Sequence, residues 1–339
     1  MRYYNYLDHK SHWLTLLLLP LSGIFLALSI MRRLGYKVGI FKSTRLPVPV
    51  VVVGNITAGG AGKSPLVMQL ALQLLAQGYR PGIVSRGYGT AQQSLAMLVE
   101  LDSQAGTVGD EPLMLARNTG CPVAVCADRV QAAELLIASK ECDVIIADDG
   151  LQHYRLARDI EIIVIDSQRQ FGNGFLLPAG PLRELPSRLA KAHFIVMNGS
   201  SDQVIDSRQT TMLFEVSLVK SLQPYGTNAE ATLLPWFQGQ TVHAVAGIAN
   251  PDRFFNLLRA HGIQVIQHDF VDHQRYQREH FEFGDDLPIL MTDKDAVKCD
   301  KLAINNAWVV KITAVLSKTF IDDITKMLSS VKRKKNAHC

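Results

Sequence analysis

The sequence predicts an α/β protein in which a parallel sheet carries helices on both faces. From residue 46 onward, short runs rich in Val and Ile alternate with segments of helical periodicity. The first such run, residues 48–53, leads into a glycine-rich turn and a helix. After a polar stretch the alternation starts again, so we expect a second, smaller α/β unit.

Composition narrows the class of protein. The chain has 339 residues, of which 47% are hydrophobic and 19% charged, and this length suffices for two α/β units with a substantial core. A net charge of +4 is too small to indicate nucleic-acid binding. The five cysteines form no Cys-x-x-Cys pair, which argues against a disulfide framework or a zinc site and indicates a reducing compartment.

The N-terminal segment is predicted to be a membrane helix. Residues 11–31 contain no Asp, Glu, Lys or Arg, and as a helix this run is about 30 Å long, enough to cross a bilayer core. We expect residues 1–35 to form this helix and its basic flank. Because Arg32, Arg33 and Lys37 follow the apolar run, the rest of the chain is expected on the cytoplasmic side. A cleaved signal peptide and a buried soluble helix are the alternatives.

The turn at residues 54–64 has the composition of a phosphate cradle. Its backbone N–H groups and the positive end of the helix dipole can hold a polyphosphate. Lys63 can reach the β- and γ-phosphates, and the Ser64 hydroxyl can bind Mg²⁺. The cradle residues before them are Thr57, Ala58, Gly59, Gly60, Ala61 and Gly62. The first glycine of the usual G-x-x-x-x-G-K-[ST] pattern is replaced by Thr57, but the sequence still predicts a P-loop NTPase-like sheet.

The remaining elements follow in order. In the first unit, strands are expected at 81–85, 122–126, 144–147, 160–165 and 194–197, helices at 65–76 and 129–139, and a loop that leads into a helix at 109–116. The polar stretch 198–208 marks a boundary, followed by a connecting β segment at 212–219. In the second unit, strands are expected at 241–248, 263–268, 288–291 and 308–312, and helices at 251–260 and 318–331. The predicted division is therefore a kinase domain at 36–200, a connecting segment at 201–240 and an α/β domain at 241–339.

Carboxylates occur at two places that suit phosphoryl transfer. The strand at 144–147 ends in Asp148-Asp149, where a carboxylate can hold Mg²⁺ beside the phosphates. Asp110 and Glu111 stand at a junction between a loop and a helix, and a kinase needs a carboxylate that accepts the proton of the acceptor hydroxyl. Composition alone favours a simpler interpretation of Asp110 and Glu111, as charges that stabilise a helix N-terminus.

Seven motifs together resemble the tetraacyldisaccharide 4'-kinases, the membrane-bound lipid A kinases of Gram-negative bacteria. The matches run in order along nearly the whole chain, at 53–65, 85–89, 109–112, 148–153, 176–184, 247–255 and 291–298. The family shares the altered first position at Thr57. The family often has Thr at the position of Ser64. It often has His at the position of Gln274, and because this chain lacks that second histidine, His273 is the better catalytic candidate.

The resemblance implies a reaction and roles for its residues. The γ-phosphate of ATP moves to the 4'-hydroxyl of a tetraacyldisaccharide 1-phosphate in the inner membrane, giving lipid IVA. Asp110 resembles the catalytic base and His273 the histidine paired with it, while Glu111 and Asp148 resemble Mg²⁺ ligands. Lys63, Ser64, Asp149, Gln152, His153, Arg183 and Glu184 match the other polar positions of the site.

Arg183 can neutralise charge on a transferring phosphoryl group, or it can be an ordinary surface arginine.

The first unit alone supplies a different hypothesis for the function. A membrane-tethered P-loop regulator or transport ATPase shares the cradle and Asp148-Asp149, but it does not explain the second unit. A soluble kinase of a small metabolite is a third possibility, and it conflicts with the N-terminal helix. No protein partner is indicated.

Overall fold

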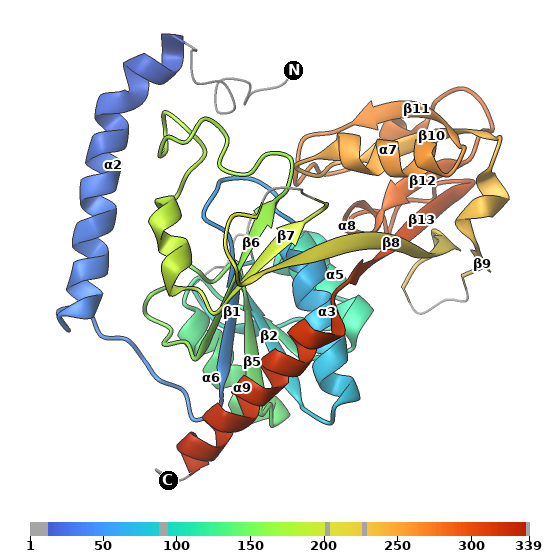
Figure 1. Cartoon of the computed structure of the whole chain (residues 1–339). Helices are drawn as coiled ribbons and strands as arrows, with labels where there is room; N and C mark the ends of the chain where they lie inside the picture. Colours follow the sequence, from blue (N-terminus) through green and yellow to red (C-terminus); the bar gives the residue numbers. More distant parts are fainter. Residues whose placement is uncertain (1–12, 88–93, 201–203, 226–228, 337–339) are drawn as a thin grey trace.

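The computed structural model describes residues 13–87, 94–200, 204–225 and 229–336. Tyr88 and Gly89 of the motif at 85–89 therefore lie outside the described residues, as do residues 1–12 of the expected N-terminal segment. The described strands form one mixed sheet in the order β11-β10-β12-β13-β8-β7-β6-β1-β5-β2-β4-β3, and β9 pairs with β8 (Figure 1). The predicted α/β class is confirmed.

The first unit contains the strands at one end of the sheet, from β7 to the edge strand β3 in sheet order. Its parallel strands are β1 (Val50–Gly54), β2 (Pro81–Ser85), β4 (Val123–Val125), β5 (Val144–Asp148), β6 (Ile160–Asp166) and β7 (Phe194–Asn198). The short edge strand β3 (Met97–Leu98), which sequence patterns did not predict, runs antiparallel to β4. The Val- and Ile-rich runs of β1 and β5 are fully buried, as expected for parallel strands covered on both faces.

Helices cover both faces of this sheet. Val51 and Val53 of β1 pack in the core that includes α3 (Lys63–Ala76) and α5 (Asp110–Thr119). Val50 and Val52 point to the opposite face, towards α6 (Arg129–Lys140), because successive side chains of a strand alternate between its two faces. Shorter helices are α4 (Ala105–Val108) and η1 (Pro186–Lys191).

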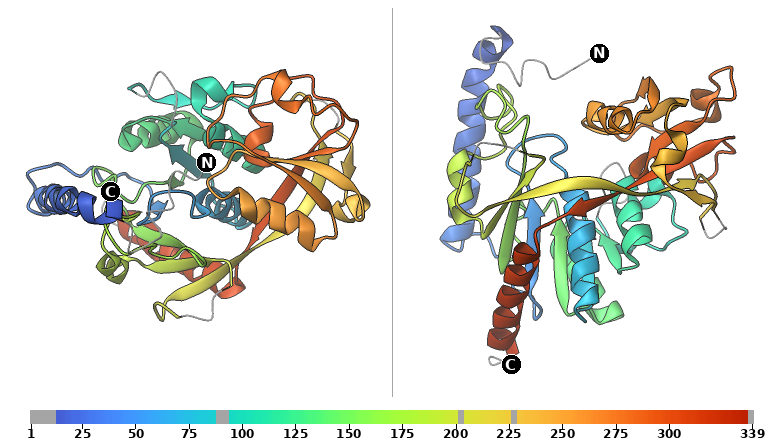
Figure 2. Two further views of the ribbon diagram at one scale, coloured as in Figure 1. Left: turned by 90° about the horizontal axis from the view of Figure 1, so that it is seen from above. Right: turned by 45° about the vertical axis from the view of Figure 1, so that its right-hand side comes forward.

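One long strand joins the two units. β8 (Gln209–Ser221) begins parallel to β7 and continues antiparallel to β13 (Ala307–Val315) (Figure 2). The expected connecting β segment is thus a strand of the common sheet. It is followed by β9 (Ala231–Thr232) and η2 (Leu234–Phe237).

The second unit surrounds the other part of the sheet. Its parallel strands are β10 (Thr241–Ala246), β11 (Gln264–Asp269), β12 (Ile289–Thr292) and β13, and its helices are α7 (Pro251–Ala260), η3 (Arg278–Phe281) and α8 (Asp293–Ala296). Phe237, Phe255 and Leu258 are buried at the centre of its core.

The last helix, α9 (Lys318–Asn336), returns to the first unit. Its apolar face, including Phe320 and Ile324, joins the core formed by β1 and α3. Lys332 pairs with Asp143 at 3.0 Å, and Lys335 with Asp159 at 2.9 Å. These two lysines attach the end of α9 to the first unit.

The predicted N-terminal helix is α2 (Trp13–Lys37), which is long and apolar enough to cross a membrane. It lies along one side of the first unit (Figure 1). On its inner side, the Ser22 hydroxyl donates to the carbonyl of Leu176 (2.8 Å) and accepts from the N–H of Ala179 (3.0 Å). Leu16, Leu17, Leu21, Ile24, Leu28, Met31 and Leu34 are exposed on the helix surface.

Candidate active site

The glycine-rich turn connects β1 to α3. Gly62, which precedes the first residue of α3, has φ +88°, and a Cβ atom there would lie 2.2 Å from Nδ2 of Asn198. Both observations require glycine. Asn198, at the end of β7, donates from Nδ2 to the carbonyl of Ala61 (2.9 Å), so a strand that is separated from β1 by β6 holds the turn in place.

The predicted cradle residues divide into two groups. Gly59, Gly60 and Lys63 line a large cleft. Ala58 instead donates its N–H to the carbonyl of Pro181 (2.6 Å), and Thr57 forms a bridge with Leu182. The altered first position of the P-loop is therefore bonded into the neighbouring loop.

Lys63 lies beside a cation–carboxylate cluster. Its Nζ donates to Oδ1 of Asn55 (3.2 Å) and lies 3.5 Å from Oδ1 of Asp149. Arg183 contacts both oxygens of Asp149, at 3.3 and 3.1 Å. Burial alone would raise the pKa of Asp149, but Lys63 and Arg183 hold it below its usual value. Asp149 thus stays ionised and orients two cations at the cleft.

Asp148 has the environment of a cation ligand. The Ser64 hydroxyl lies 3.5 Å from its Oδ2, and its buried Oδ1 has no hydrogen-bond partner among the described residues. Burial and then the charge of Glu111 raise the pKa of Asp148 to about 7. Within the described residues no three His, Cys, Asp or Glu side chains form a metal-binding group. This donor set still fits Mg²⁺, which keeps waters and substrate oxygens among its ligands.

Asp110 and His273 meet across the two units. Asp110 is the first residue of α5, and His273 lies in the loop that follows β11. Nδ1 of His273 lies 3.1 and 3.0 Å from the two oxygens of Asp110. Burial would raise the pKa of Asp110, but the bond to His273 and the charge of Lys294 hold it below its usual value. The same bond raises the pKa of His273 against the effect of burial, so the two groups favour an ion pair.

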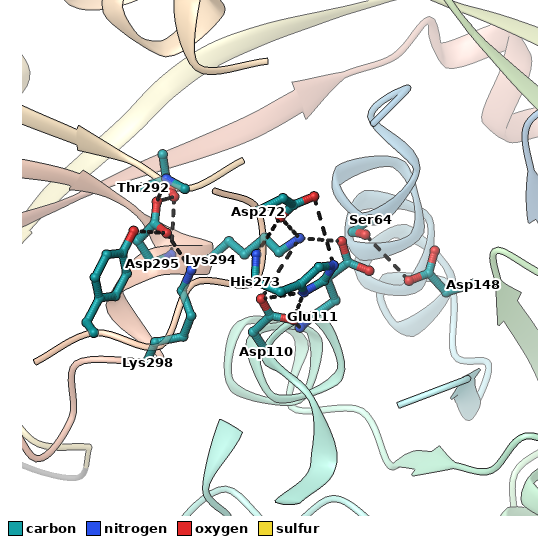
Figure 3. A network of polar contacts seen from close by, with 12 residues as sticks. Ser64, Asp110, Glu111, Asp148, Asp272, His273, Thr292, Lys294, Asp295 and Lys298 are labelled. Carbon is teal, nitrogen blue, oxygen red and sulfur yellow. Dashed lines mark hydrogen bonds and ion pairs between the residues drawn. The ribbon is translucent and has the colours of Figure 1, made fainter. Parts of the chain in front are cut away.

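Behind this pair lies a largely buried lysine that sequence reasoning did not single out. Lys294 of α8 contacts Oε1 of Glu111 at 2.8 Å and Oδ1 of Asp272 at 2.9 Å (Figure 3). Glu111 is therefore paired with Lys294, and its charge also reaches Asp148. Lys294 lies in the motif at 291–298, which is the one sequence signal that could have identified it.

Gln152 lines the cleft, where it connects the glycine-rich turn to Glu184. Its Nε2 donates to the carbonyl of Asn55 (3.2 Å) and to Oε1 of Glu184 (3.0 Å). The other oxygen of Glu184 accepts from Tyr154 (2.8 Å) and lies 3.5 Å from Nη1 of Arg33 in α2. The buried Glu184 carboxylate thus connects the N-terminal helix to the P-loop.

Basic residues line the cleft beyond these groups. Arg129, which sequence reasoning missed, is buried at the start of α6, and its Nε has no hydrogen-bond partner among the described residues. Burial and then the charge of Arg86 lower the pKa of Arg129, and burial with Arg129 lowers that of His153 to about 4. Arg129 follows a parallel strand at its carboxyl end, where ligands usually bind in such sheets, and this rule could have found it.

Most of these groups line one cleft of about 1640 Å³, larger than the roughly 300–1,000 Å³ of an ordinary small-molecule pocket. Its lining comes from α2, from the first unit and from the second unit, and includes Phe25, Arg33, Lys63, Asp110, Asn250 and His273. The cleft therefore has room for a nucleotide and a large acceptor beside an apolar helix.

Comparison with known proteins identifies the family. Residues 14–329 match the family model for tetraacyldisaccharide-1-P 4'-kinase. A tetraacyldisaccharide 4'-kinase from Alkalilimnicola ehrlichii is 48% identical over 309 residues, 91% of each chain. One from Nitrosococcus oceani is 44% identical over 98% of this chain and 95% of its own.

A solved structure agrees with these relatives. The crystal structure of LpxK from Aquifex aeolicus in complex with ATP has a TM-score of 0.78 and 27% identity, and the match covers 93% of this chain and 99% of that one. The matches extend over both units and α2, so they concern the whole arrangement around the cleft. The chain belongs to the tetraacyldisaccharide 4'-kinase family.

Proposed function

We propose that the protein transfers the γ-phosphate of ATP to the 4'-hydroxyl of tetraacyldisaccharide 1-phosphate, a step of lipid A biosynthesis that forms lipid IVA. One observation carries this proposal beyond family membership. The Asp110–His273 pair lines the same cleft as Lys63 and the glycines of the P-loop. A candidate base and a phosphate-binding lysine thus share a single cavity, as transfer between two bound substrates requires.

On the donor side, the positive groups bind and orient the triphosphate. Lys63 and the backbone of Gly59 and Gly60 hold its phosphates. Arg183 is oriented by Asp149, and it stabilises the charge that develops on the transferring group. The contacts of Asp149 with both cations support these roles.

Mg²⁺ fits beside these groups, with Ser64 and Asp148 as ligands and Glu111 next to them. When bound, the ion neutralises charge on the phosphates. Oδ1 of Asp148, which has no hydrogen-bond partner in the described part of the chain, and the raised pKa of this carboxyl support the assignment, because a buried carboxylate oxygen in such a position favours a cation.

On the acceptor side, Asp110 takes the proton from the 4'-hydroxyl. His273 holds the carboxylate in place through Nδ1, and the ionised form of Asp110 is the form that can accept a proton. Because Asp110 belongs to the first unit and His273 to the second, the catalytic pair depends on both. This supports the proposed division into a nucleotide-binding part at 36–200, a connecting segment at 201–240 and a C-terminal part at 241–339.

The lipid acceptor gives α2 a role. We propose that α2 attaches the protein to the cytoplasmic side of a bacterial inner membrane, with Arg32, Arg33 and Lys37 near the lipid head groups. Phe25 and Ser29 of α2 also line the cleft, which supports a path for the disaccharide from the bilayer to Asp110.

A labelling experiment tests the proposal. The purified full-length chain is incubated with γ-³²P-ATP and Mg²⁺, with and without tetraacyldisaccharide 1-phosphate in detergent micelles. We expect labelled lipid in the complete reaction. Release of labelled phosphate without labelled lipid would instead support a membrane-tethered regulator or transport ATPase.

A further inference from the structure

We propose that Lys294 is a positioning residue for the Asp110–His273 pair. It holds the residue that follows Asp110 and the residue that precedes His273, and so sets how the two units meet at the base. This inference rests on the proposed function, because it concerns the geometry of the residue assigned as the base.

The first observation is the set of contacts that Lys294 makes. Its Nζ lies 2.8 Å from Oε1 of Glu111 and 2.9 Å from Oδ1 of Asp272. The same atom lies 3.9 Å from Oδ2 of Asp110. Glu111 belongs to the first turn of α5, whereas Asp272 and Lys294 belong to the second unit (Figure 3). One ammonium group, with three donors, therefore joins the chain neighbours of both members of the pair.

The second observation is where Lys294 lies relative to the cleft. Asp110, Glu111, Asp272 and His273 all line the cleft, but Lys294 is not among its lining residues. Its side chain is only 11% exposed. Lys294 thus lies behind the residues that line the cleft, where it can hold them in place.

The third observation is that Lys294 and the His273 loop share one support. Asp295, the residue after Lys294, is fully buried and accepts from the hydroxyls of Thr292 (2.6 Å) and Tyr276 (2.8 Å). Tyr276 lies in the same loop as His273, and the N–H of Gly247 at the end of β10 donates to Asp295 as well (3.0 Å). The lysine and the histidine are therefore placed against α5 by a common buried carboxylate.

A simpler interpretation is that Lys294 only ties the two units together. Lys311 offers a matched control for that effect. It also reaches from the second unit to α5, where its Nζ contacts Oδ1 of Asn118 at 2.9 Å, and it pairs with Asp293. Asn118 is near the opposite end of α5 from Asp110. If tethering were the whole role, loss of either lysine would have a similar effect on turnover.

The experiment compares Lys294→Met, Lys294→Arg and Lys311→Met with the unaltered full-length chain in the lipid-labelling assay. We expect Lys294→Met to lower kcat by about 10- to 100-fold, the range found when an outer-shell residue that orients a functional group is replaced. The KM for ATP and the Kd for ATP are expected to stay unchanged, since Lys63 and the P-loop are intact. Lys294→Arg should restore part of kcat, and Lys311→Met should keep kcat unchanged.

A double-mutant cycle separates positioning from a general loss of structure. If Lys294 acts through the pair, Lys294→Met should cause little further loss of kcat in a His273→Ala background. Multiplied losses, an unchanged kcat in Lys294→Met, or an equal loss in Lys311→Met would each overturn the inference. If circular dichroism shows that Lys294→Met does not fold, Asp272→Asn removes the partner of Lys294 and is expected to lower kcat in the same way. An unchanged kcat in Asp272→Asn also overturns the inference.

These outcomes differ from failure of the proposed function. If the unaltered chain does not label the lipid, or if Asp110→Ala keeps full turnover, the proposed function itself is wrong. If the unaltered chain is active and Asp110→Ala is not, normal turnover in Lys294→Met counts against the role of the lysine alone.

Discussion

The two sides of the cleft are built in different ways. The donor side follows from local sequence: β1, the glycine-rich turn and the start of α3 are continuous, and Asp148 ends the neighbouring strand β5. The base side joins Asp110 of the first unit to His273, which is 163 residues further along the chain. Local geometry thus determines the phosphate site, whereas the base depends on how two units pack.

This difference has an energetic consequence. A turn between a strand and a helix loses little entropy when it forms, because its ends are already close, whereas a contact between distant segments needs a large loop to close first. The base side therefore needs additional contacts to hold it. Lys294, Asp272 and Asp295 supply such contacts. Changes on the donor side should weaken ATP binding, and changes on the base side should lower turnover alone.

The largest expected effect is on the base side. Asp110→Ala should lower kcat by about 10²- to 10⁴-fold, the usual contribution of a general base, with little change in the Kd for ATP. Lipid labelling and calorimetric ATP titration measure the two quantities. If turnover were unchanged, Asp110 would not be the base and the contrast between the two sides would fail.

The next effect is on the donor side. Lys63→Ala should weaken ATP binding and also lower kcat by about 10²- to 10³-fold, as expected when a group that stabilises developing charge is removed. The same labelling assay and titration apply. Normal ATP affinity in Lys63→Ala would contradict the P-loop assignment. Lys42→Ala is the control variant, because Lys42 is not among the residues that line the cleft.

A smaller effect is expected for His273→Gln. It should lower kcat by about 10- to 100-fold, because Asp110 keeps its charge but loses its partner. The pKa of His273 is raised in the folded protein, so protonated His273 stabilises the fold. This stabilisation is fully present below about pH 6.5, the pKa of histidine in the unfolded chain, and it is lost as the pH rises through the pKa of the folded protein. The difference in Tm between the variant and the unaltered chain should therefore be larger at pH 6 than at pH 9. Gln274→Ala, in the same loop, should change neither quantity.

The smallest effect separates the two adjacent aspartates. The pKa of Asp148 is raised to about 7, so keeping it ionised destabilises the metal-free fold increasingly between about pH 4, its unfolded value, and pH 7. Without Mg²⁺ and ATP, Asp148→Asn should raise Tm by about 2–6 °C at pH 8 and by less at pH 5. Asp149, whose pKa is lowered, should behave oppositely, so Asp149→Asn should lower Tm at pH 8. Equal shifts for both would contradict the assigned environments.

Much of the fold was predictable because its signals are local. The apolar runs of β1, β2, β5 and β6 identified buried parallel strands, and the helices α3, α6 and α7 were placed with small differences at their ends. The short elements β3 and α4 were missed, since two to four residues carry no periodicity. The course of α9 was also missed, because an amphipathic helix does not specify which of two cores its apolar face joins.

The sequence by itself determined the class of fold, the phosphate loop and the apolar helix, and it predicted candidates for the site, since glycine positions, apolar runs and short motifs act over a few neighbouring residues. Only the tertiary structure decided that Lys294 stands behind the Asp110–His273 pair, that Arg129 faces the cleft and that α2 forms part of its wall. The placement of Lys294 depends on the packing of α8 against α5, whereas those of Arg129 and α2 depend on packing within and along the first unit. Such contacts bring together groups far apart in the chain, and no local pattern encodes the distance between them.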